Sequence, residues 1–370
     1  MNELDYVTTV LESGRLAGDG VFCARAESLL GELTGAHSAL VTSSCTHALE
    51  MCAMLLDAPS GSEIIVPDFT FPSTANAFAM LGYRPVFADI DPATLNISPE
   101  SARSCVSSRT VAIVVMHYGG VACDMEAFRS LCDDHDLILI EDNAHGLGGT
   151  WNDAPLGTFG NLATQSFHET KNISCGEGGA LLINDDSYKD RAEILREKGT
   201  NRSLFRRGLA DKYTWVDTGS SYVLSEVSAA ILLAQLEDFL LIQANRRHAW
   251  STYRNRLEQW GLQRGVRFQS VPEYVSSACH AFPLLFPSPH DRDRFIDHLD
   301  RHGITAVFHY QPLHASRMGR LTGANREDCS VSTSVAECLV RLPLYSGIQC
   351  DEVERVVEAT IASETPIRRG

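Results

Sequence analysis

The residues whose chemistry stands out are a lysine, an aspartate, a histidine and nearby hydroxyl side chains. Asp142 follows the apolar run LILIE, His145 comes three residues later, and Lys171 lies five residues after Ser166 in the block SFHETKN. A lysine amine can attack a carbonyl carbon or act as a base. A carboxylate stabilises a neighbouring cation. This combination predicts imine chemistry at the ends of strands.

Pyridoxal phosphate (PLP) needs these groups for different parts of its structure. The cofactor forms an imine with a lysine amine, and Lys171 can supply it. Its pyridine nitrogen needs an acidic partner, for which Asp142 is placed. Its phosphate needs backbone N–H groups at a helix N-terminus and hydroxyl groups. The run Ser-Cys-Thr at 44–46 and the Ser166 hydroxyl can provide them.

Each residue also has a simpler interpretation. Lys171 alone would be a solvated charge, Asp142 alone could cap a helix, and the run 44–46 alone is an N-cap. Phe71 alone fits the core and His145 alone fits a satisfied polar residue. In a PLP site, Phe71 would cover the ring and His145 would hydrogen-bond the ring phenolate. The PLP hypothesis depends on the conjunction of these roles.

Short apolar runs alternate with amphipathic stretches up to about residue 183. The predicted strands are 38–42, 63–67, 85–89, 110–116 and 137–141. The predicted helices are 47–56, 72–81 and 124–135. The continuously apolar runs TVAIVVM and LILIE are typical of strands buried on both faces. We therefore predict an α/β fold with a mostly parallel sheet, which binds ligands beyond the carboxyl ends of its strands.

The pattern changes beyond residue 183. The chain of 370 residues exceeds what one core usually holds. We expect a large PLP-binding domain over 1–242 and a small C-terminal α+β domain over 243–370, connected by a helix over about 243–260. The remaining predicted elements are helices at 186–198, 225–240, 290–302 and 351–362, an Arg-rich loop at 199–217, and strands at 281–286 and 304–310.

The composition excludes several classes of partner. The formal net charge of −16 argues against nucleic acid or an anionic membrane surface, because both require a basic face. The eleven cysteines are odd in number and lack CxxC spacing, which predicts free thiols in a reducing compartment rather than a metal site. The N-terminus has no apolar run typical of a signal peptide or membrane span. We expect a cytoplasmic protein.

The sequence resembles the nucleotide-sugar aminotransferases of the DegT–StrS group, which have the aspartate-aminotransferase fold (PLP fold type I). The resemblance covers nearly the whole chain. The blocks that carry it are SGRLAGDGVF at 13–22, VTSSCTHALE at 41–50, VPDFTFPSTANA at 66–77, HYGGVACDM at 117–125, EDNAHG at 141–146, SFHETKNISCGEGG at 166–179, KGTNRS at 198–203, KYTWVDTGSSYVLSE at 212–226, HYQPLH at 309–314 and RLPLY at 341–345.

The resemblance implies a role for each matching residue. Lys171 corresponds to the Schiff-base lysine and Asp142 to the partner of the pyridine nitrogen. The remaining implied cofactor contacts are Cys45, Thr46 and Ser166 at the phosphate, Phe71 on the ring face, His145 at the phenolate, and Ser221 reaching the phosphate from the other subunit. Many relatives have asparagine at the Ser221 position. The chain begins at NELDY, where relatives usually have a short preceding arm, so either the arm is absent or the start is later than expected.

The blocks HETKN and GSSY resemble the branch that aminates carbon 4 of a TDP-4-keto-6-deoxyhexose. The implied enzyme is a homodimer with shared active sites that uses L-glutamate and passes through pyridoxamine phosphate. The loop residues Arg202, Arg206, Arg207 and Lys212 could contact the substrate diphosphate, or the loop could be merely solvated. The implied substrate contacts of HYQPLH are His309 and Tyr310. The alternatives are amination at carbon 3, dehydration of the sugar, and a non-catalytic interaction protein on the same scaffold. Lys171 disfavours dehydration, because the dehydratases of the family have histidine at that position.

Overall fold

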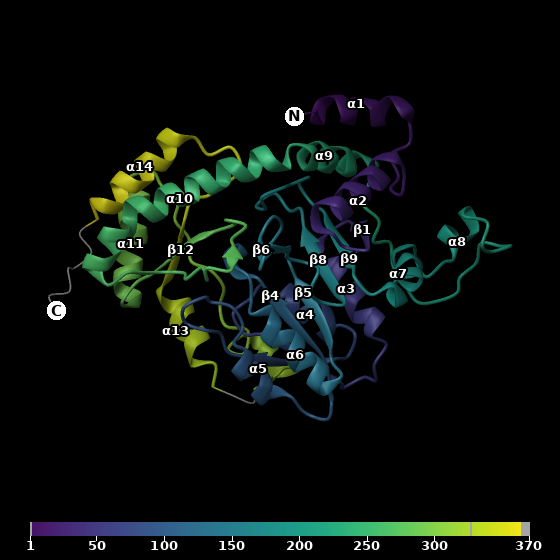
Figure 1. Ribbon diagram of the computed structural model, residues 1–370, viewed down its shortest axis with the longest axis horizontal. Coiled ribbons are helices and arrows are strands. Elements are labelled where there is room, and N and C mark those ends of the chain that lie inside the picture. The colour runs from purple at the N-terminus through teal and green to yellow at the C-terminus, as the bar shows by residue number, and fades with distance from the viewer. Residues whose placement is uncertain (1, 326–327, 364–370) are drawn as a thin grey trace.

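The computed structural model describes residues 2–325 and 328–363 (Figure 1). A large sheet occupies the centre of the molecule and helices cover both of its faces. The helices are α1 (Glu3–Ser13), α2 (Val21–Thr34), α3 (Cys45–Leu56), α4 (Ser73–Ala79), α5 (Pro99–Cys105), α6 (Met125–His135), α7 (Lys189–Arg196), α8 (Arg202–Arg206), α9 (Glu226–Glu237), α10 (Phe239–Arg264), α11 (Pro289–Arg301), α12 (Arg317–Thr322), α13 (Ser330–Cys338) and α14 (Cys350–Ile361), with 3-10 turns η1 (Tyr118–Gly120) and η2 (Asp186–Tyr188).

The large sheet has eight strands in the order β1-β9-β8-β5-β4-β2-β3-β13. Their bounds are β1 (Ser38–Thr42), β2 (Glu63–Pro67), β3 (Arg84–Ala88), β4 (Thr110–Met116), β5 (Ile138–Asp142), β8 (Leu162–Ser166), β9 (Gly179–Ile183) and β13 (Ala324–Asn325). All neighbours are parallel except β9, which is antiparallel to both β8 and β1. The mostly parallel sheet predicted from the sequence is confirmed.

Two smaller sheets complete the strands of the described residues. The order β10-β12-β14 joins β10 (Arg267–Phe268), β12 (Phe282–Leu285) and β14 (Leu339–Leu342), and the order β11-β6-β7 joins β11 (Val275–Ser276), β6 (Thr150–Trp151) and β7 (Ala154–Pro155).

Alternate side chains of the central strands enter two different apolar clusters. Ile64 and Val66 of β2 pack in the cluster that contains α3 and α4 residues, whereas Ile65 packs in the cluster that contains α5 and α6 residues. In β4, Val114 and Val115 divide in the same way. This burial on both faces explains the continuous apolar runs. Truncating one such side chain to alanine would cost about 2–5 kcal/mol.

The long helix α10 crosses from the large sheet toward the C-terminal elements (Figure 1). It begins four residues before the predicted start at 243, after a break at Asp238. Its first turn contributes Phe239 and Ile242 to the cluster around β8 and β9. Its later residues, from Ala249 onward, pack with β12, α11 and α14. The domain boundary after residue 242 stays a prediction, and this change of packing partner agrees with it.

One predicted strand, 304–310, is wrong. Within it only Val307 forms a β-bridge, with Arg341 of β14. Tyr310 then adopts a left-handed backbone with φ of +36°, and Pro312 lacks an N–H group for a ladder. The segment therefore leaves the sheet after residue 307. Its last residues, His309 and Tyr310, instead contact the ring of Tyr118, which follows β4.

The other predicted elements agree to within a few residues. The exceptions are the first residues of the predicted helix 186–198, which form η2, and the loop 199–217, which contains the short helix α8. Within residues 2–325 and 328–363, no single helix is long and apolar enough to cross a membrane, and α9 with α10 satisfies the same test only as a pair bent by 65°.

Candidate active site

The candidate site lies beyond the carboxyl ends of β5 and β8, where the sequence places it. Asp142 is the last residue of β5 and Ser166 is the last residue of β8. Ser166 stands opposite Gly179 of β9, which in turn stands opposite Thr42 of β1. Because α3 begins just after β1, this row brings the end of β8 next to the start of α3.

Asp142 is almost completely buried at 4% exposure. Its Oδ2 accepts a hydrogen bond from the Thr74 hydroxyl at 2.7 Å, and its Oδ1 accepts one from the Ala144 N–H at 3.2 Å. Burial raises the pKa of this carboxyl, and these hydrogen bonds and the charge of Lys171 oppose the increase. A cation held beside Asp142 would favour its ionised form.

Lys171 lies in a tight turn in which its N–H donates to the His168 carbonyl at 2.9 Å. The side chain is half-buried. Desolvation lowers the pKa of its amine, Cys45 and Asp142 raise it, and Arg341 lowers it further. The lowered pKa increases the fraction of neutral amine, the form that can act as a nucleophile or a base.

The residue after Lys171 is anchored by the C-terminal part of the chain. Asn172 donates to the Ala278 carbonyl at 2.8 Å and to Gln243 at 3.3 Å. Its Oδ1 is therefore the acceptor for His280 Nδ1 at 2.9 Å. The Ser346 hydroxyl donates to the Asn172 carbonyl at 2.7 Å. These contacts fix the turn that presents the lysine.

The start of α3 is the position at which the sequence predicts that the phosphate binds. Ser44 is the N-cap, and its hydroxyl accepts from the His47 N–H at 3.1 Å. The Thr46 hydroxyl lies 2.8 Å from that of Ser73. Burial raises the pKa of the Cys45 thiol to about 12, so it stays protonated. The first backbone N–H groups of a helix have no intrahelical partner and attract anions.

His145 belongs to a cluster of aromatic and histidine rings. It stacks on His280 with ring centroids 3.9 Å apart, and its Nε2 lies 3.3 Å from the Tyr310 hydroxyl. Its Nδ1 accepts from the Gly119 N–H at 3.4 Å. Burial and the charges of nearby residues lower its pKa well below the usual value. The neutral ring therefore carries its proton on Nε2.

The predicted substrate contacts His309 and Tyr310 join the same cluster. His309 Nδ1 lies 2.9 Å from the Tyr118 hydroxyl, and burial lowers the pKa of His309 to about 2. Phe71, predicted to cover the ring, is 56% exposed, and its ring centroid is 6.3 Å from that of Tyr310. Phe71 thus leaves a face open for a planar ligand.

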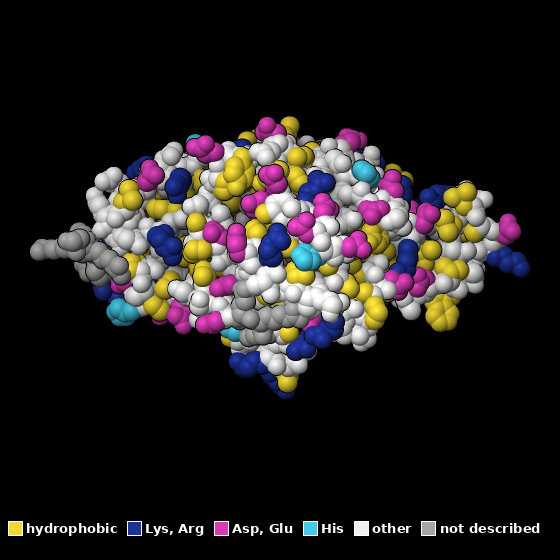
Figure 2. Space-filling model, turned by 60° about the horizontal axis from the view of Figure 1, so that its bottom comes forward, with side chains coloured by type: hydrophobic (Ala, Val, Ile, Leu, Met, Phe, Trp, Pro, Cys, Tyr) yellow, Lys and Arg dark blue, Asp and Glu magenta, His cyan; other side chains and the backbone are white. Residues whose placement is uncertain are grey.

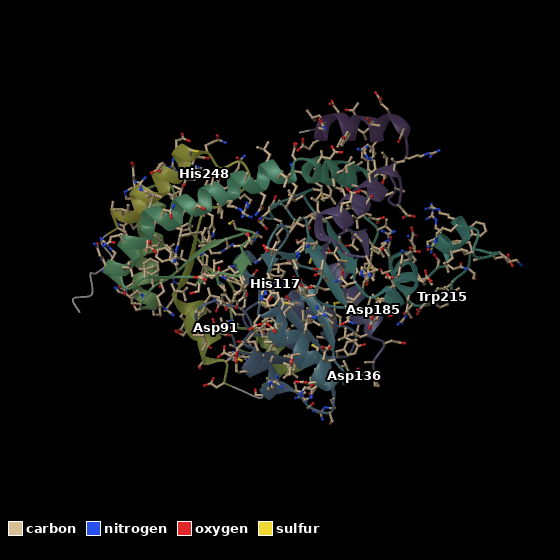
Figure 3. The ribbon with its side chains drawn as sticks, viewed as in Figure 1. Asp91, His117, Asp136, Asp185, Trp215 and His248 are labelled. Atoms are coloured by element: carbon tan, nitrogen blue, oxygen red, sulfur yellow. The ribbon has the colours of Figure 1, made fainter. Side chains whose placement is uncertain are left out.

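The other predicted residues do not join this group through any contact within the described chain. Ser221 is exposed and forms a β-bridge with Glu197. Arg202 lies 3.6 Å from Glu197, and Lys212 is exposed. Figure 3 shows how far the Arg-rich loop lies from the end of the central strands. His117, which follows β4, is near the centre of the molecule, and Trp215 of the loop is on the outer projection.

Several supporting residues were missed from the sequence. His117 Nε2 contacts Glu141 at 2.9 Å, and Glu141 accepts from three backbone N–H groups between 157 and 160, which fixes the end of β5. Thr74 was read only as part of a helix, although it lies three residues after Phe71. His280 lies in the loop before β12 and Arg341 lies in the short strand β14, and no spacing signal linked either residue to Lys171.

One group of possible metal ligands occurs in the described part of the chain, namely Asp68, His314 and Cys329. Asp68 accepts from both the backbone N–H and Nδ1 of His314 at 2.7 Å. This pair already ties the segment after residue 309 to the end of β2. All eleven cysteines are free thiols, as their odd number predicts.

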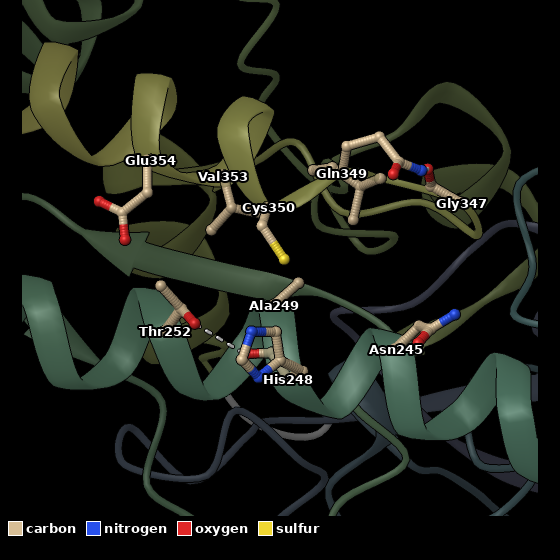
Figure 4. A pocket seen from close by; sticks show the side chains of 10 residues that line it. Asn245, His248, Ala249, Thr252, Gly347, Gln349, Cys350, Val353 and Glu354 are labelled. Carbon is tan, nitrogen blue, oxygen red and sulfur yellow. Dashed lines mark hydrogen bonds between the residues drawn. The ribbon is translucent and has the colours of Figure 1, made fainter.

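A separate pocket lies between α10 and α14 (Figure 4) and shares no residue with the predicted site. His248, Thr252, Cys350 and Glu354 are among its lining residues. The Thr252 hydroxyl donates to the His248 carbonyl at 3.0 Å, as an ordinary bond within a helix.

The residues present fit PLP. A Cβ at Gly179 would lie 2.3 Å from the Cys45 nitrogen, so only glycine lets β9 pass this close to the start of α3. The donor set comprises helix N–H groups and hydroxyls at one end, a buried carboxyl at the other, and an amine with a lowered pKa. The fold and these groups define a PLP enzyme of fold type I.

Comparison with known proteins identifies the family. Residues 1–360 match the DegT/DnrJ/EryC1/StrS aminotransferase family. GDP-perosamine synthase from Vibrio cholerae is 30% identical over 356 residues, which cover 96% of this chain and 94% of that protein. Spore coat polysaccharide biosynthesis protein SpsC from Bacillus subtilis is 30% identical over 365 residues, covering 96% and 93%. The solved aminotransferase TlmJ from Streptoalloteichus hindustanus has a TM-score of 0.90 at 28% identity, covering 98% and 96%. The chain belongs to this family and is a PLP-dependent sugar aminotransferase.

Proposed function

We propose that the protein transfers the amino group of L-glutamate to carbon 4 of a TDP-4-keto-6-deoxyhexose, giving a TDP-4-amino-4,6-dideoxyhexose. The observation that carries this proposal is the block SFHETKN at 166–172, whose lysine is coupled electrostatically to Asp142. The resemblance of HETKN and GSSY to the carbon-4 branch supports the position of amination.

We further propose how the residues divide the work. Bound PLP would supply an electron sink for moving the amino group. Lys171 would hold the cofactor and, once released, take and return the proton at Nζ. Asp142 would stabilise the positive ring nitrogen. His145 would donate from Nε2 toward the phenolate oxygen. Cys45, Thr46 and Ser166 would hold the phosphate.

The lowered pKa of Lys171 supports its role as a base. An amine with the ordinary pKa of about 10.4 is almost fully protonated at neutral pH. Desolvation weakens that protonation, and the described chain places no carboxylate in hydrogen-bond contact with the Lys171 amine. The neutral histidines around it add no full positive charge.

The nucleotide attached to the sugar distinguishes two candidate substrates. One relative is named for a GDP-linked product, whereas the blocks HETKN and GSSY favour a TDP-sugar. The same reaction on a GDP-4-keto-6-deoxyhexose is therefore the second candidate. The two candidates share the sugar chemistry and differ only in the base and ribose that the enzyme recognises.

The test is direct competition between the two nucleotides. The enzyme is incubated with PLP, L-glutamate and equal amounts of TDP- and GDP-4-keto-6-deoxyhexose, and the products are identified by NMR. The proposal expects the TDP-4-amino sugar to dominate, with the new nitrogen on carbon 4. A dominant GDP product would select the second candidate, and amination at carbon 3 or loss of water would contradict both.

We also propose a homodimer with shared sites. Five large apolar side chains of the Arg-rich loop are exposed: Phe205, Leu209, Tyr213, Trp215 and Val216. The loop and α8 stand away from the body of the molecule in Figure 1, and apolar side chains are visible at the same end in Figure 2. A second copy that covers this projection would bring Ser221 and the loop toward its own PLP site. Aromatic and arginine side chains are typical of such interfaces.

A further inference from the structure

Arg341 of β14 is a cation without a partner beside the candidate site. Its side chain is half-buried and its Nε is completely buried without a hydrogen-bond partner. Over residues 2–325 and 328–363, no carboxylate pairs with its guanidinium. Arg246 also has an Nε and an Nη1 without a hydrogen-bond partner, but it is 1% exposed and therefore closed to a ligand, and its Nη2 donates to the His280 and Leu344 carbonyls. A guanidinium left unpaired at a partly open position favours an anionic ligand.

The surroundings of Arg341 indicate which end of the site this ligand occupies. The backbone of Arg341 pairs with Val307, two residues before His309. Its charge lowers the pKa of Lys171, His145 and His309. The Cys45 thiol at the phosphate end responds instead to Asp142 and Lys171. The bridge to Val307, together with these charge effects, assigns Arg341 to the amine end of the site rather than to the phosphate end.

We propose that Arg341 binds the α-carboxylate of the amino donor. This inference rests on the proposed use of L-glutamate. The donor must bring its α-amino group to the position of the Lys171 amine, and its α-carboxylate is attached to the same carbon. The planar guanidinium fork matches a carboxylate with two parallel hydrogen bonds. The neighbouring histidines are neutral and Arg246 is buried against backbone carbonyls, so Arg341 is the accessible full positive charge that the described chain provides there besides Lys171.

The experiment separates the two half-reactions of the holoenzyme. The first is conversion of the PLP form to the pyridoxamine form by L-glutamate, followed by absorbance without any sugar. The second is the single-turnover reaction of the purified pyridoxamine form with the keto-sugar. Arg341→Gln should raise the glutamate concentration needed for half-maximal rate about tenfold to a hundredfold, and should change the sugar half-reaction less than twofold.

Two further variants define the interpretation. Arg341→Lys keeps the charge but loses the fork, and should show a smaller increase for glutamate than Arg341→Gln. Arg355→Gln is the matched control, because the exposed Arg355 donates only to the Gly303 carbonyl at 3.1 Å. It should leave both half-reactions unchanged. Equal melting temperatures and visible spectra would show that the variants are folded and loaded.

Three outcomes would overturn the assignment. Unchanged glutamate dependence in both Arg341 variants would mean that Arg341 does not bind the donor. A defect confined to the sugar half-reaction would assign Arg341 to the substrate diphosphate instead. Equal defects in both half-reactions would indicate a structural role. Failure of the wild-type enzyme to react with glutamate would instead show that the proposed donor is wrong. That result comes from the wild type alone, so it is distinguishable from a failure of the Arg341 assignment.

Discussion

The PLP region and the projecting loop differ in how their side chains are satisfied. Asp142 is 4% exposed and has two hydrogen-bond donors within the chain, whereas Trp215 on the projection is 77% exposed. Buried polar groups require partners, and the chain supplies them around β5. Large aromatic side chains on an extended loop instead favour contact with another surface. Within the described chain the buried cofactor residues have intramolecular partners, whereas the exposed aromatic side chains of the loop are left for a partner surface, as the proposed shared site requires.

The largest expected effect is at Lys171. Lys171→Ala removes both the amine that would hold PLP and the base, and should lower kcat by more than about a thousandfold. The visible absorbance of bound PLP should disappear or shift. Steady-state transamination and the absorbance spectrum measure this. A Lys171→Ala protein that transaminates at the wild-type rate would show that Lys171 is not the lysine that holds PLP.

The next effect is at Asp142 and its donor Thr74. Asp142→Asn keeps the shape but loses the negative charge beside the ring nitrogen, and should lower kcat about a hundredfold because charged hydrogen bonds contribute ~1.5–3 kcal/mol. Thr74→Val removes one hydrogen bond to the Asp142 carboxylate but leaves its negative charge in place, and should lower kcat by about tenfold. Paired kcat and PLP-binding measurements would test the order. A Thr74→Val defect as large as that of Asp142→Asn would contradict the electrostatic role.

The shared-site proposal gives the third prediction. Ser221→Ala should weaken PLP retention about tenfold to a hundredfold if its hydroxyl bonds a dianionic phosphate. Gel filtration after dialysis, with absorbance of the retained cofactor, measures this. Neighbouring Ser220 is also exposed, so Ser220→Ala is the matched control and should retain PLP normally.

Mixed dimers would sharpen the same prediction. A Lys171→Ala subunit is combined with a subunit carrying Ser221→Trp, each inactive as a homodimer. Shared sites leave the heterodimer with one site built from two intact halves, so the mixture should regain activity. A mixture that stays inactive after confirmed subunit exchange, or a fully active wild-type monomer, would show that each site belongs to one chain.

The sequence predicted the elements around the proposed cofactor region because their signals are local. Asp142 follows an apolar strand and Ser44 caps a helix, so both positions follow from the pattern of a single element. The segment 304–310 was misread because its apolar alternation is typical of a strand, whereas the backbone of Tyr310 and the Asp68–His314 contact turn it toward the site. Thr74, His280 and Arg341 were missed because their roles depend on contacts between distant elements, which single-sequence spacing does not encode.

The smallest expected effect distinguishes charges within the Arg-rich loop. Arg207 lies 2.7 Å from Glu193, Arg206 pairs with Asp19, and Arg202 lies 3.6 Å from Glu197. Lys212 is exposed, and no side chain in the described ranges pairs with its amine. An arginine that already forms an ion pair within its own chain would have to break that pair to bind a substrate diphosphate.

Lys212→Ala should therefore raise KM for the nucleotide sugar about two- to fivefold, because exposed charge pairs contribute only ~0.2–1 kcal/mol. Arg207→Ala should leave KM unchanged and serves as the matched control, with Arg202→Ala between the two. PLP binding should be unaffected in all three, because the loop does not contact the cofactor region of its own chain. The measurement is KM at low ionic strength and again at high salt, since screening should remove an electrostatic effect. If KM is the same in all variants at both salt concentrations, the charges of the loop are solvated and do not bind the substrate diphosphate. The exposed aromatic side chains of the loop would then be its remaining candidate contacts.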